Sequence, residues 1–384
     1  MSLLDVHSAS AQDRRFMLLA LGMARRRLGQ TAPNPAVGAL IVDEATGELI
    51  ARGSTQPGGR PHAETHVLER AGQRARGKTM YVTLEPCSHY GQTPPCVDAI
   101  LAAGVARVVC AIEDPDPRVS GKGLALLREK GVRTDVGIAA ACARWMAAGH
   151  ILRMTRGRPF VQLKIAVSAD GRIAPGTGAP VWVTGTEARG YAHLLRARAD
   201  VILVGRKTVS DDDPELTCRL PGLARRSPRR AVLDPSLQTA PHSKLALTAA
   251  RVPVTIFTAA GPRRGAAAGF PAGVSLRQVA ASGGNRLDLP AVLASLNADG
   301  VTRVMVEGGP TISAAFLTAG LVDEAVIARG TQVLGARGRP PLVGCGVEVF
   351  EDTRLWECVV ERAVGEDRLS IYRAAGRLDP GSGA

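Results

Sequence analysis

The chain is poor in aromatic residues and in lysine, and it has no long apolar run. Aromatic side chains make up 3% of its 384 residues, and only six of its 48 basic residues are lysine. No uncharged apolar run reaches the roughly 18 residues that a membrane span needs. The first residues also lack the basic-then-apolar order of a secretory signal. We therefore expect a cytoplasmic protein without a membrane partner.

The formal net charge of +13 raises the hypothesis of nucleic-acid binding. The densest basic cluster, at 225–230, contains no aromatic residue on which a base could stack. A solvated basic loop is the simpler interpretation, and a phosphorylated small substrate would also suit a basic surface. We expect no nucleic-acid partner, and whether the chain forms a homo-oligomer stays open.

The length and a hydrophobic content of 45% exclude a wholly disordered chain and favour two domains. Predicted strands alternate with predicted helices, which is typical of layered α/β sheets. We expect a first domain at 1–156, a second at 157–377 and a flexible tail at 378–384. Gly157 and Pro159 interrupt regular structure and mark the boundary between the two domains. Strands are expected at 37–42, 49–51, 78–84, 107–112, 201–204, 231–233, 254–257 and 303–307 and from 160 onward, and helices at 12–28, 96–103, 122–130 and 186–198 and from about 62.

Seven cysteines, an odd number spread along the chain, do not suggest a disulfide framework, but two of them lie at metal-ligand spacing. Cys87 follows a predicted strand, Cys96 comes nine positions later, and His62 opens a predicted helix. One imidazole and two thiolates provide three ligands for tetrahedral zinc and leave a fourth position for water, as in catalytic sites. Glu64, two residues after the histidine, can then move protons as a general acid and base.

The order H-x-E, then P-C, then C is the signature of zinc-dependent nucleobase deaminases. With the long cysteine loop PCSHYGQTPPC and further matches at 33–38, 114–117 and 121–123, the first domain resembles the deaminase domain of the bifunctional riboflavin-biosynthesis deaminase/reductase family. The resemblance implies a cytidine-deaminase-like three-layer α/β/α fold. It also implies one zinc ion held by His62, Cys87 and Cys96, with Glu64 as the catalytic residue.

Three further polar residues of this domain each have two interpretations. Asn34 is either a turn-capping residue or, as the resemblance implies, a substrate contact. His66 lies one turn after His62, but the zincin order H-E-x-x-H is not kept, so we expect a packed or solvent-facing residue. His89, within the cysteine loop, either orients that loop or contacts the substrate.

No G-x-G-x-x-G occurs, so the sequence does not support a Rossmann dinucleotide site. Instead, a predicted strand runs into Gly308-Gly309-Pro310 before a helix, where backbone amides can hold a phosphate. Together with 164–172, 182–184, 194–196, 205–208, 212–219 and 320–324, this motif resembles the reductase domain of the same family. That resemblance implies a dihydrofolate-reductase-like α/β fold that uses NADPH.

The resemblance also implies which residues of the second domain contact ligands. For NADPH they are Val167, Trp182, Thr208, Asp212 and Gly309, and for the substrate Arg196, Leu216, Arg219 and Glu307. The two arginines suit a ribose 5-phosphate, which guanidinium groups bind in bidentate fashion. Pro180 stands where family members often have a small polar residue, so one hydroxyl contact to substrate is lost or replaced by backbone.

These features predict an enzyme for two consecutive steps of riboflavin synthesis. The first is zinc-dependent deamination of 2,5-diamino-6-(5-phosphoribosylamino)pyrimidin-4(3H)-one. The second is NADPH-dependent reduction of the ribosyl group of 5-amino-6-(5-phosphoribosylamino)uracil to ribityl. Two alternatives stay open. A nucleic-acid base deaminase with an accessory basic domain would bind RNA or DNA in a salt-sensitive way. A non-catalytic zinc-stabilised binding module would need a fourth protein ligand.

Overall fold

The structure, a computed structural model, describes residues 10–173, 181–259, 269–283 and 286–378. The chain divides into two compact units, the first ending at Gly157 and the second beginning at Arg158. The expected flexible tail, apart from Leu378, and the contact expected to be lost at Pro180 lie outside the described residues. Among the described helices, none combines the length and apolar character that crossing a membrane requires.

The first unit is built on a five-stranded sheet of order β2-β1-β3-β4-β5. β1 (Gly38–Asp43) pairs antiparallel with β2 (Glu48–Ser54) and with β3 (Thr79–Val82). β3, β4 (Arg107–Cys110) and β5 (Arg133–Val136) run parallel to one another, so their carboxyl ends meet at one edge of the sheet. Every residue of β3 is buried, which indicates that both faces of the sheet are covered.

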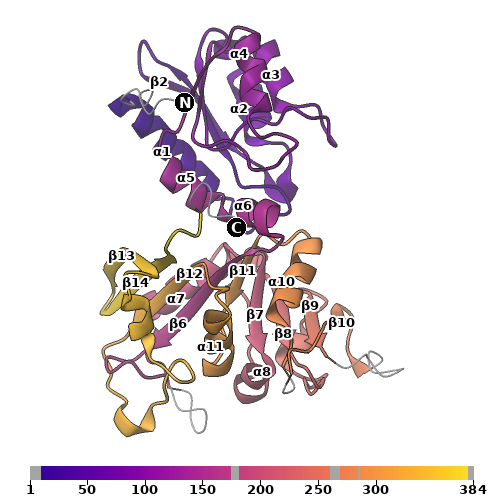
Figure 1. Cartoon of the computed structure of the whole chain (residues 1–384), viewed down its shortest axis with the longest axis vertical. Helices are drawn as coiled ribbons and strands as arrows, with labels where there is room; N and C mark the ends of the chain where they lie inside the picture. Colours follow the sequence, from indigo (N-terminus) through magenta and orange to yellow (C-terminus); the bar gives the residue numbers. More distant parts are fainter. Residues whose placement is uncertain (1–9, 174–180, 260–268, 284–285, 379–384) are drawn as a thin grey trace. The chain divides into compact units, whose positions relative to one another are not determined.

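Helices cover both faces of this sheet (Figure 1). α1 (Ala11–Arg25) and α5 (Ala140–Met146) lie on one face, and α2 (Ala63–Ala71), α3 (Cys96–Ala103) and α4 (Lys122–Glu129) on the other. α1 turns an apolar stripe that includes Phe16 and Ala20 toward the strands. A Cβ at Gly38 would lie 1.9 Å from the Ala20 carbonyl oxygen, so only glycine allows β1 to approach α1 this closely. This is the three-layer α/β/α arrangement expected from the sequence.

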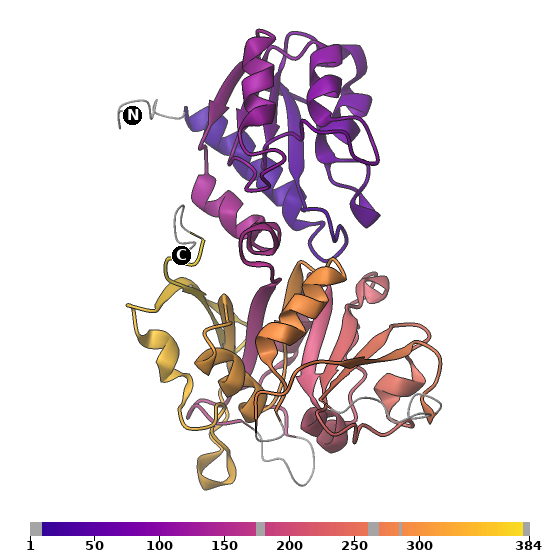
Figure 2. The ribbon, with the colours of Figure 1, turned by 45° about the vertical axis from the view of Figure 1, so that its right-hand side comes forward.

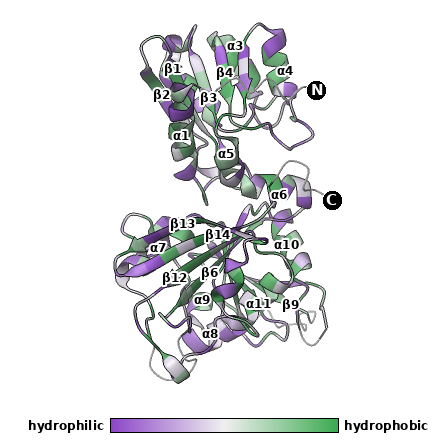
Figure 3. Ribbon diagram, turned by 60° about the vertical axis from the view of Figure 1, so that its left-hand side comes forward, coloured by the Kyte–Doolittle hydropathy of each residue, from purple (hydrophilic) through white to green (hydrophobic). Residues whose placement is uncertain are grey.

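The second unit is built on a nine-stranded sheet of order β10-β9-β8-β7-β11-β6-β12-β14-β13. The seven strands from β10 to β12 pair in parallel, and a final hairpin adds β14 and β13 in antiparallel pairing. The central strands are strongly hydrophobic, as Figure 3 shows for β6 and β12. The strand bounds are β6 (Phe160–Val167), β7 (Val201–Gly205), β8 (Arg229–Leu233), β9 (Val254–Thr258), β10 (Val274–Gln278), β11 (Arg303–Val306), β12 (Glu324–Arg329), β13 (Trp356–Val364) and β14 (Asp367–Ala374).

Successive residues of these strands pack against different helices, because side chains alternate between the two faces of a sheet. Val304 and Val306 of β11 share a hydrophobic core with residues of α10 (Leu289–Ala298) and α11 (Pro310–Thr318), which cover one face in Figure 2. Met305 packs instead against α7 (Thr186–Arg196) on the opposite face. Among the described residues of this unit, two more α-helices form, α8 (Arg206–Asp212) and α9 (Lys244–Leu247).

Most expected helices and strands form within a few residues of their predicted bounds. α8, α9, α10, β10 and β12 were not predicted, and three further segments differ from expectation. The segment at 150–158, expected to hold the boundary, is mostly helical: α6 (Ala148–Arg156) continues to Gly157, whose φ of 62° ends it. β5 has one apolar residue in four, so pairing with β4 rather than its own pattern makes it a strand. The hairpin of β13 and β14 was not expected, because charged residues interrupt the apolar ones of β13.

A buried ion pair joins the beginnings of β6 and β12. The Asp323 carboxylate accepts hydrogen bonds from Arg158 Nη1 and Nη2 at 2.8 and 2.7 Å, and from the Val161 amide at 2.8 Å. Arg377 Nε lies 3.3 Å from the same carboxylate. Because Asp323 has no exposed surface, removing it would leave the Arg158 charge buried without a carboxylate.

We expect Asp323→Ala to lower the free energy of unfolding by about 3–5 kcal/mol, the usual cost of removing one partner from a buried ion pair. Urea denaturation followed by fluorescence measures this change. Asp352→Ala is the matched control, because Asp352 pairs with Arg354, whose side chain is 86% exposed, and it should cost less than about 1 kcal/mol. Equal effects of the two substitutions would contradict the structural role of Asp323.

Candidate active sites

Three potential metal ligands of the first unit converge where β3 ends and two helices begin. His62 is the N-cap of α2, Cys87 follows β3, and Cys96 is the first residue of α3. His62 Nδ1 lies 3.4 Å from Cys96 Sγ and 3.7 Å from Cys87 Sγ, and all three ligand atoms lie within 4.8 Å of one another. Nitrogen and sulfur ligands of one tetrahedral zinc ion are about 3.5 Å apart, so these residues fit a single ion.

The local backbone favours a thiolate at Cys87. The Cys96 amide, at the N-terminus of α3, donates a hydrogen bond to Cys87 Sγ at 3.3 Å. Hydrogen bonds from the Cys96 thiol and from His62 lower the pKa of Cys87 to about 4, against the opposing effect of burial. The Cys96 thiol bonds to Cys87 and is buried, and both effects raise its pKa. The two cysteines therefore carry one negative charge between them, and a divalent cation would displace the remaining proton.

Glu64 places a buried carboxyl group beside these ligands. It lies in the first turn of α2, is 4% exposed, and interacts with the Cys96 thiol. Burial raises the pKa of Glu64 to about 7, although the neighbouring His62 opposes the change. A carboxyl group that titrates near neutrality can both accept and donate a proton, which general acid–base chemistry requires.

Asn34 lies next to His62. Its Nδ2 donates a hydrogen bond to the Gly59 carbonyl oxygen at 2.8 Å and lies 3.5 Å from His62 Nε2. Gly59 has a φ of 87°, and a Cβ there would lie 2.8 Å from the Asn34 amide nitrogen. The contact therefore depends on glycine, and it holds the Asn34 side chain at the metal-ligand cluster.

Neither His66 nor His89 belongs to the metal-ligand cluster found among the described residues. His66 Nδ1 lies 2.9 Å from Gln56 Nε2, so its ring packs against the loop that precedes α2. His89 is half-buried, and its Nδ1 has no hydrogen-bond partner within the part of the chain that is described. The zincin arrangement, in which His66 would be a ligand, is thus not formed by these residues.

The buried carboxylate of Glu85 holds the segment after β4 against the strand that leads to Cys87. This role of Glu85 was not predicted from the sequence. Its Oε2 accepts from the amides of Asp114 and Gly121 at 3.1 and 2.8 Å, and its Oε1 from those of Gly123 and Leu124 at 3.0 and 3.3 Å. A Cβ at Gly123 would lie 2.2 Å from the Pro86 carbonyl oxygen. The GKG motif therefore allows α4 to pack beside the ligand strand, and it was the signal that could have pointed to Glu85.

The second unit has a cavity of about 390 Å³, to which β6, α7, α8, α11 and the loops next to them contribute. Seven of the nine ligand-contacting residues predicted for this unit line it, namely Trp182, Arg196, Thr208, Asp212, Leu216, Glu307 and Gly309. Two do not. Val167 is the fully buried last residue of β6, and Arg219 lines a different cavity.

Glu307 joins two cations in this cleft. Arg196 Nε lies 2.9 Å from one carboxylate oxygen of Glu307, and Lys164 Nζ lies 3.4 Å from the other. Burial alone would raise the pKa of Glu307, but Arg196 and Lys164 lower it to about 2. Lys164 belonged to a matching stretch of sequence but was not predicted as a site residue. The alternation of β6, which places Lys164 on the face opposite to Val161 and Leu163, was the available signal.

Other lining groups of the cleft suit a nucleotide. Trp182 is 63% exposed, with the Arg189 guanidinium 5.0 Å from its ring centroid. α11 begins after Gly309 with no side-chain cap, so backbone amides of its first turn are available to a ligand. A Cβ at Gly308 would contact Ile312 at 3.1 Å, whereas nothing lies within 4 Å of one at Gly309. Gly308 therefore serves packing, and only Gly309 leaves open space.

Comparison with known families assigns both units. Residues 10–112 match the cytidine and deoxycytidylate deaminase zinc-binding region, and residues 159–367, more than half of the chain, match the RibD C-terminal domain. This chain belongs to the RibD family. RibD proteins join a deaminase and a reductase of riboflavin biosynthesis, and this chain has both domains.

RibD proteins match this chain over most of its length. The RibD protein of Aquifex aeolicus is 39% identical over 84% of this chain and 88% of its own, and that of Escherichia coli is 38% identical over 93% and 98%. The structure of Acinetobacter baumannii RibD has a TM-score of 0.82 at 32% identity, and a Thermotoga maritima deaminase/reductase has 0.82 at 31%. Each covers 95% of this chain and 99% of its own. The predicted family, fold class and bifunctional activity are confirmed.

The two RibD domains imply zinc and a nicotinamide cofactor. The donor set of His62, Cys87 and Cys96 fits zinc in both residue types and spacing. The cleft of the reductase domain combines an exposed aromatic ring, uncapped amides and several cations, which fits a nicotinamide dinucleotide.

We expect Glu85→Gln to loosen the segment at 114–124, because the new NH₂ group faces backbone donors and leaves buried amides without an acceptor, at a cost of about 1–3 kcal/mol. Faster hydrogen exchange of the Gly121, Gly123 and Leu124 amides and a lower deamination rate measure the effect. The reductase rate of the same chain should not change. Glu129→Gln is the control, because Glu129 is an exposed residue of α4. Unchanged exchange in Glu85→Gln would show that Glu85 does not hold this segment.

Proposed function

We propose that the deaminase domain hydrolyses the 2-amino group of 2,5-diamino-6-(5-phosphoribosylamino)pyrimidin-4(3H)-one. The observation that carries the proposal is the convergence of His62, Cys87 and Cys96 beside the buried carboxyl group of Glu64. The Thermotoga maritima relative supports the choice of substrate, because it is described as a diaminohydroxyphosphoribosylaminopyrimidine deaminase/5-amino-6-(5-phosphoribosylamino)uracil reductase.

In this proposal His62, Cys87 and Cys96 hold one zinc ion, which when bound supplies a Lewis acid that activates water. Glu64 accepts one proton from the attacking water and delivers it to a ring nitrogen as the C–O bond forms. It then carries the second proton, from the added hydroxyl, to the amine, so that the C–N bond breaks, ammonia leaves and a carbonyl group remains. Burial suits Glu64 to this task, because its raised pKa lets it release the proton again. Asn34, held beside His62 by Gly59, contacts the pyrimidine.

We infer that the reductase domain reduces the ribosyl group of 5-amino-6-(5-phosphoribosylamino)uracil to ribityl. The nicotinamide cofactor supplies the hydride for the sugar C1′. Trp182, Thr208, Asp212 and the turn at Gly309 hold the cofactor, and all four line one cleft with the substrate residues. The choice of NADPH is supported by three more cations in that cleft, Arg189, Lys207 and Arg339, which suit an additional phosphate.

Arg196, Leu216 and Glu307 bind the substrate in the same cleft. Glu307 keeps the cations of Arg196 and Lys164 side by side, where Arg196 can neutralise the substrate phosphate and Lys164 can donate to a sugar oxygen. Leu216 has a φ of 56°, which turns its backbone sharply at the cleft wall. The roles proposed for Val167 and Arg219 stay predictions, and neither residue lines the cleft.

We expect Glu64→Gln to retain zinc and to lower the rate of ammonia release by about 10²–10⁴-fold, because the amide cannot transfer protons. Metal analysis and an ammonia assay measure the two quantities, and reduction of the deaminated substrate should proceed as before. Glu69→Gln, at an exposed position of the same helix, is the matched control. Full deamination by Glu64→Gln would refute the role of Glu64.

We expect Glu307→Gln to lower kcat/KM of the reductase by about 10–100-fold, because a neutral amide no longer holds Arg196 and Lys164 together in the cleft. NADPH oxidation measured with the deaminated substrate tests this. Deamination by the same chain is the internal control and should be unchanged. Loss of both activities to the same degree would indicate a folding defect and would not support substrate binding by Glu307.

A further inference from the structure

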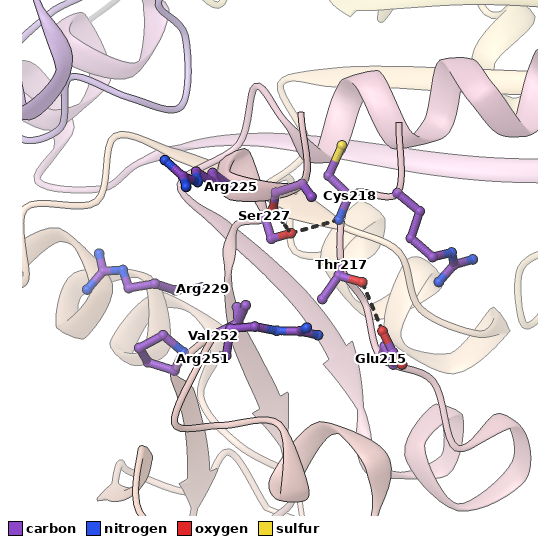
Figure 4. Close-up of a pocket in the computed structure, with 11 residues that line it drawn as sticks. Glu215, Thr217, Cys218, Arg225, Ser227, Arg229, Arg251 and Val252 are labelled. Carbon is purple, nitrogen blue, oxygen red and sulfur yellow. Dashed lines mark hydrogen bonds between the residues drawn. The ribbon is translucent and has the colours of Figure 1, made fainter. Parts of the chain in front are cut away.

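A second cavity of the reductase domain lies outside the substrate cleft, and Arg219 is the one predicted substrate contact that lines it. It has a volume of about 530 Å³ and is lined by the segment from 215 to 229 and by residues 251–253, just before β9 (Figure 4). It shares no lining residue with the substrate cleft. Thr217 belongs to the wall between the two, because it lines the second cavity while its carbonyl oxygen accepts a hydrogen bond from Arg196 of the cleft at 3.0 Å.

The lining of this cavity is rich in guanidinium groups. Arg219, Arg225, Arg229 and Arg251 contribute to it, and Glu215 is its only acidic residue. All four arginines are solvent-exposed, and none forms an ion pair with another described residue. Four cations around one cavity repel one another, and an anion bound among them would relieve that repulsion.

The neutral polar groups of the lining are already engaged. Ser227 Oγ accepts from the Cys218 amide at 3.0 Å and donates to the Ala224 carbonyl oxygen at 2.7 Å. Thr217 Oγ1 donates to the Glu215 carboxylate at 3.2 Å, and Figure 4 shows both the Ser227–Cys218 and the Thr217–Glu215 contacts. The guanidinium groups are therefore the donors that remain for a ligand.

A fifth arginine lies buried behind this lining. Arg230 is 1% exposed, and its guanidinium donates to the carbonyl oxygens of Glu215 and Val252, which are lining residues, and to Thr248 Oγ1. Its Nε has no partner among the described residues, and no carboxylate is hydrogen-bonded to it. Burial and the neighbouring Arg251 lower the pKa of Arg230 to about 10, so the group stays charged at neutral pH. Its charge, opposed among the lining residues only by Glu215, adds to the positive potential of the cavity.

We propose that this cavity binds a small molecule that carries two or more phosphate groups. Guanidinium groups bind phosphate oxygens through paired, charge-assisted hydrogen bonds, and several phosphates are needed to match several arginines. The volume is that of a typical small-molecule site. No aromatic residue lines the cavity, so a nucleobase would find no ring to stack on, and recognition rests on the phosphates.

Isothermal titration of the zinc-loaded full chain with inorganic pyrophosphate, at constant ionic strength, tests the proposal. We expect pyrophosphate to bind at least about ten-fold more tightly than inorganic phosphate, because it can engage more of the arginines at once. The double variant Arg225→Ala/Arg229→Ala should weaken pyrophosphate binding by at least about ten-fold, while its circular dichroism and reductase rate stay those of the unaltered chain. Arg14→Ala/Arg15→Ala, at exposed positions of α1, removes the same charge and is the matched control.

Three results would overturn the proposal. The first is a lack of pyrophosphate binding at millimolar concentration, or an equal weakening of that binding in both double variants. In the latter case the general positive charge of the chain would explain the binding. The second is competition between pyrophosphate and the pyrimidine substrate in the reductase reaction, if this competition is absent in Arg225→Ala/Arg229→Ala. The cavity would then hold the substrate's own phosphate. The third is tighter binding of a single-stranded oligonucleotide than of pyrophosphate, lost in the same variant. None of these results would alter the assignment of the two active sites.

Discussion

The unpaired backbone amides at helix starts are the constraint on which both active sites depend. α1 and α10 satisfy some of these amides with the side chains of their own N-cap residues, Ser10 and Asp288. α2, α3, α4 and α11 have no side-chain cap of their own. In the deaminase domain, the sulfur of Cys87 accepts from the first amide of α3, and the carboxylate of Glu85 accepts from amides at the start of α4. The groups that build the site thus also accept hydrogen bonds from the otherwise unpaired amides of these helices, and these bonds fix their positions.

Buried charge is balanced differently in the two domains. In the deaminase domain, burial leaves Glu64 with a pKa of about 7, so its carboxyl group is poised to exchange protons. In the reductase domain, two cations hold Glu307 ionised, so it serves as a fixed negative charge that positions Arg196 and Lys164. Arg230 differs from both, because no carboxylate hydrogen-bonds to it and only neutral oxygens accept its protons. These three environments suit the proton carrier, the positioning charge and the anion-attracting potential that we propose for Glu64, Glu307 and Arg230.

Local sequence patterns predicted much of the fold because they report directly on local structure. The strand–helix alternation and the three metal ligands follow from residue types at short spacing, so the α/β class and the cluster of His62, Cys87 and Cys96 could be read without a structure. Glu85 escaped notice, because it is 29 to 39 residues away from the amides that it binds. β5 escaped for the same kind of reason, since its strand conformation comes from the neighbour that it pairs with.

The sequence by itself determined the alternation of strands and helices, the donor atoms of the metal site and membership of the RibD family, because each is written in contiguous motifs. Only the tertiary structure decided that Lys164, Arg196 and Glu307 meet, since Glu307 lies more than 100 residues from both cations and their approach depends on the order of strands in the sheet. It also decided that Arg219 lines a second cavity rather than the cleft. Spacing along a chain specifies which face of a strand or helix a residue occupies, whereas the partner across that face is set by packing of the whole domain.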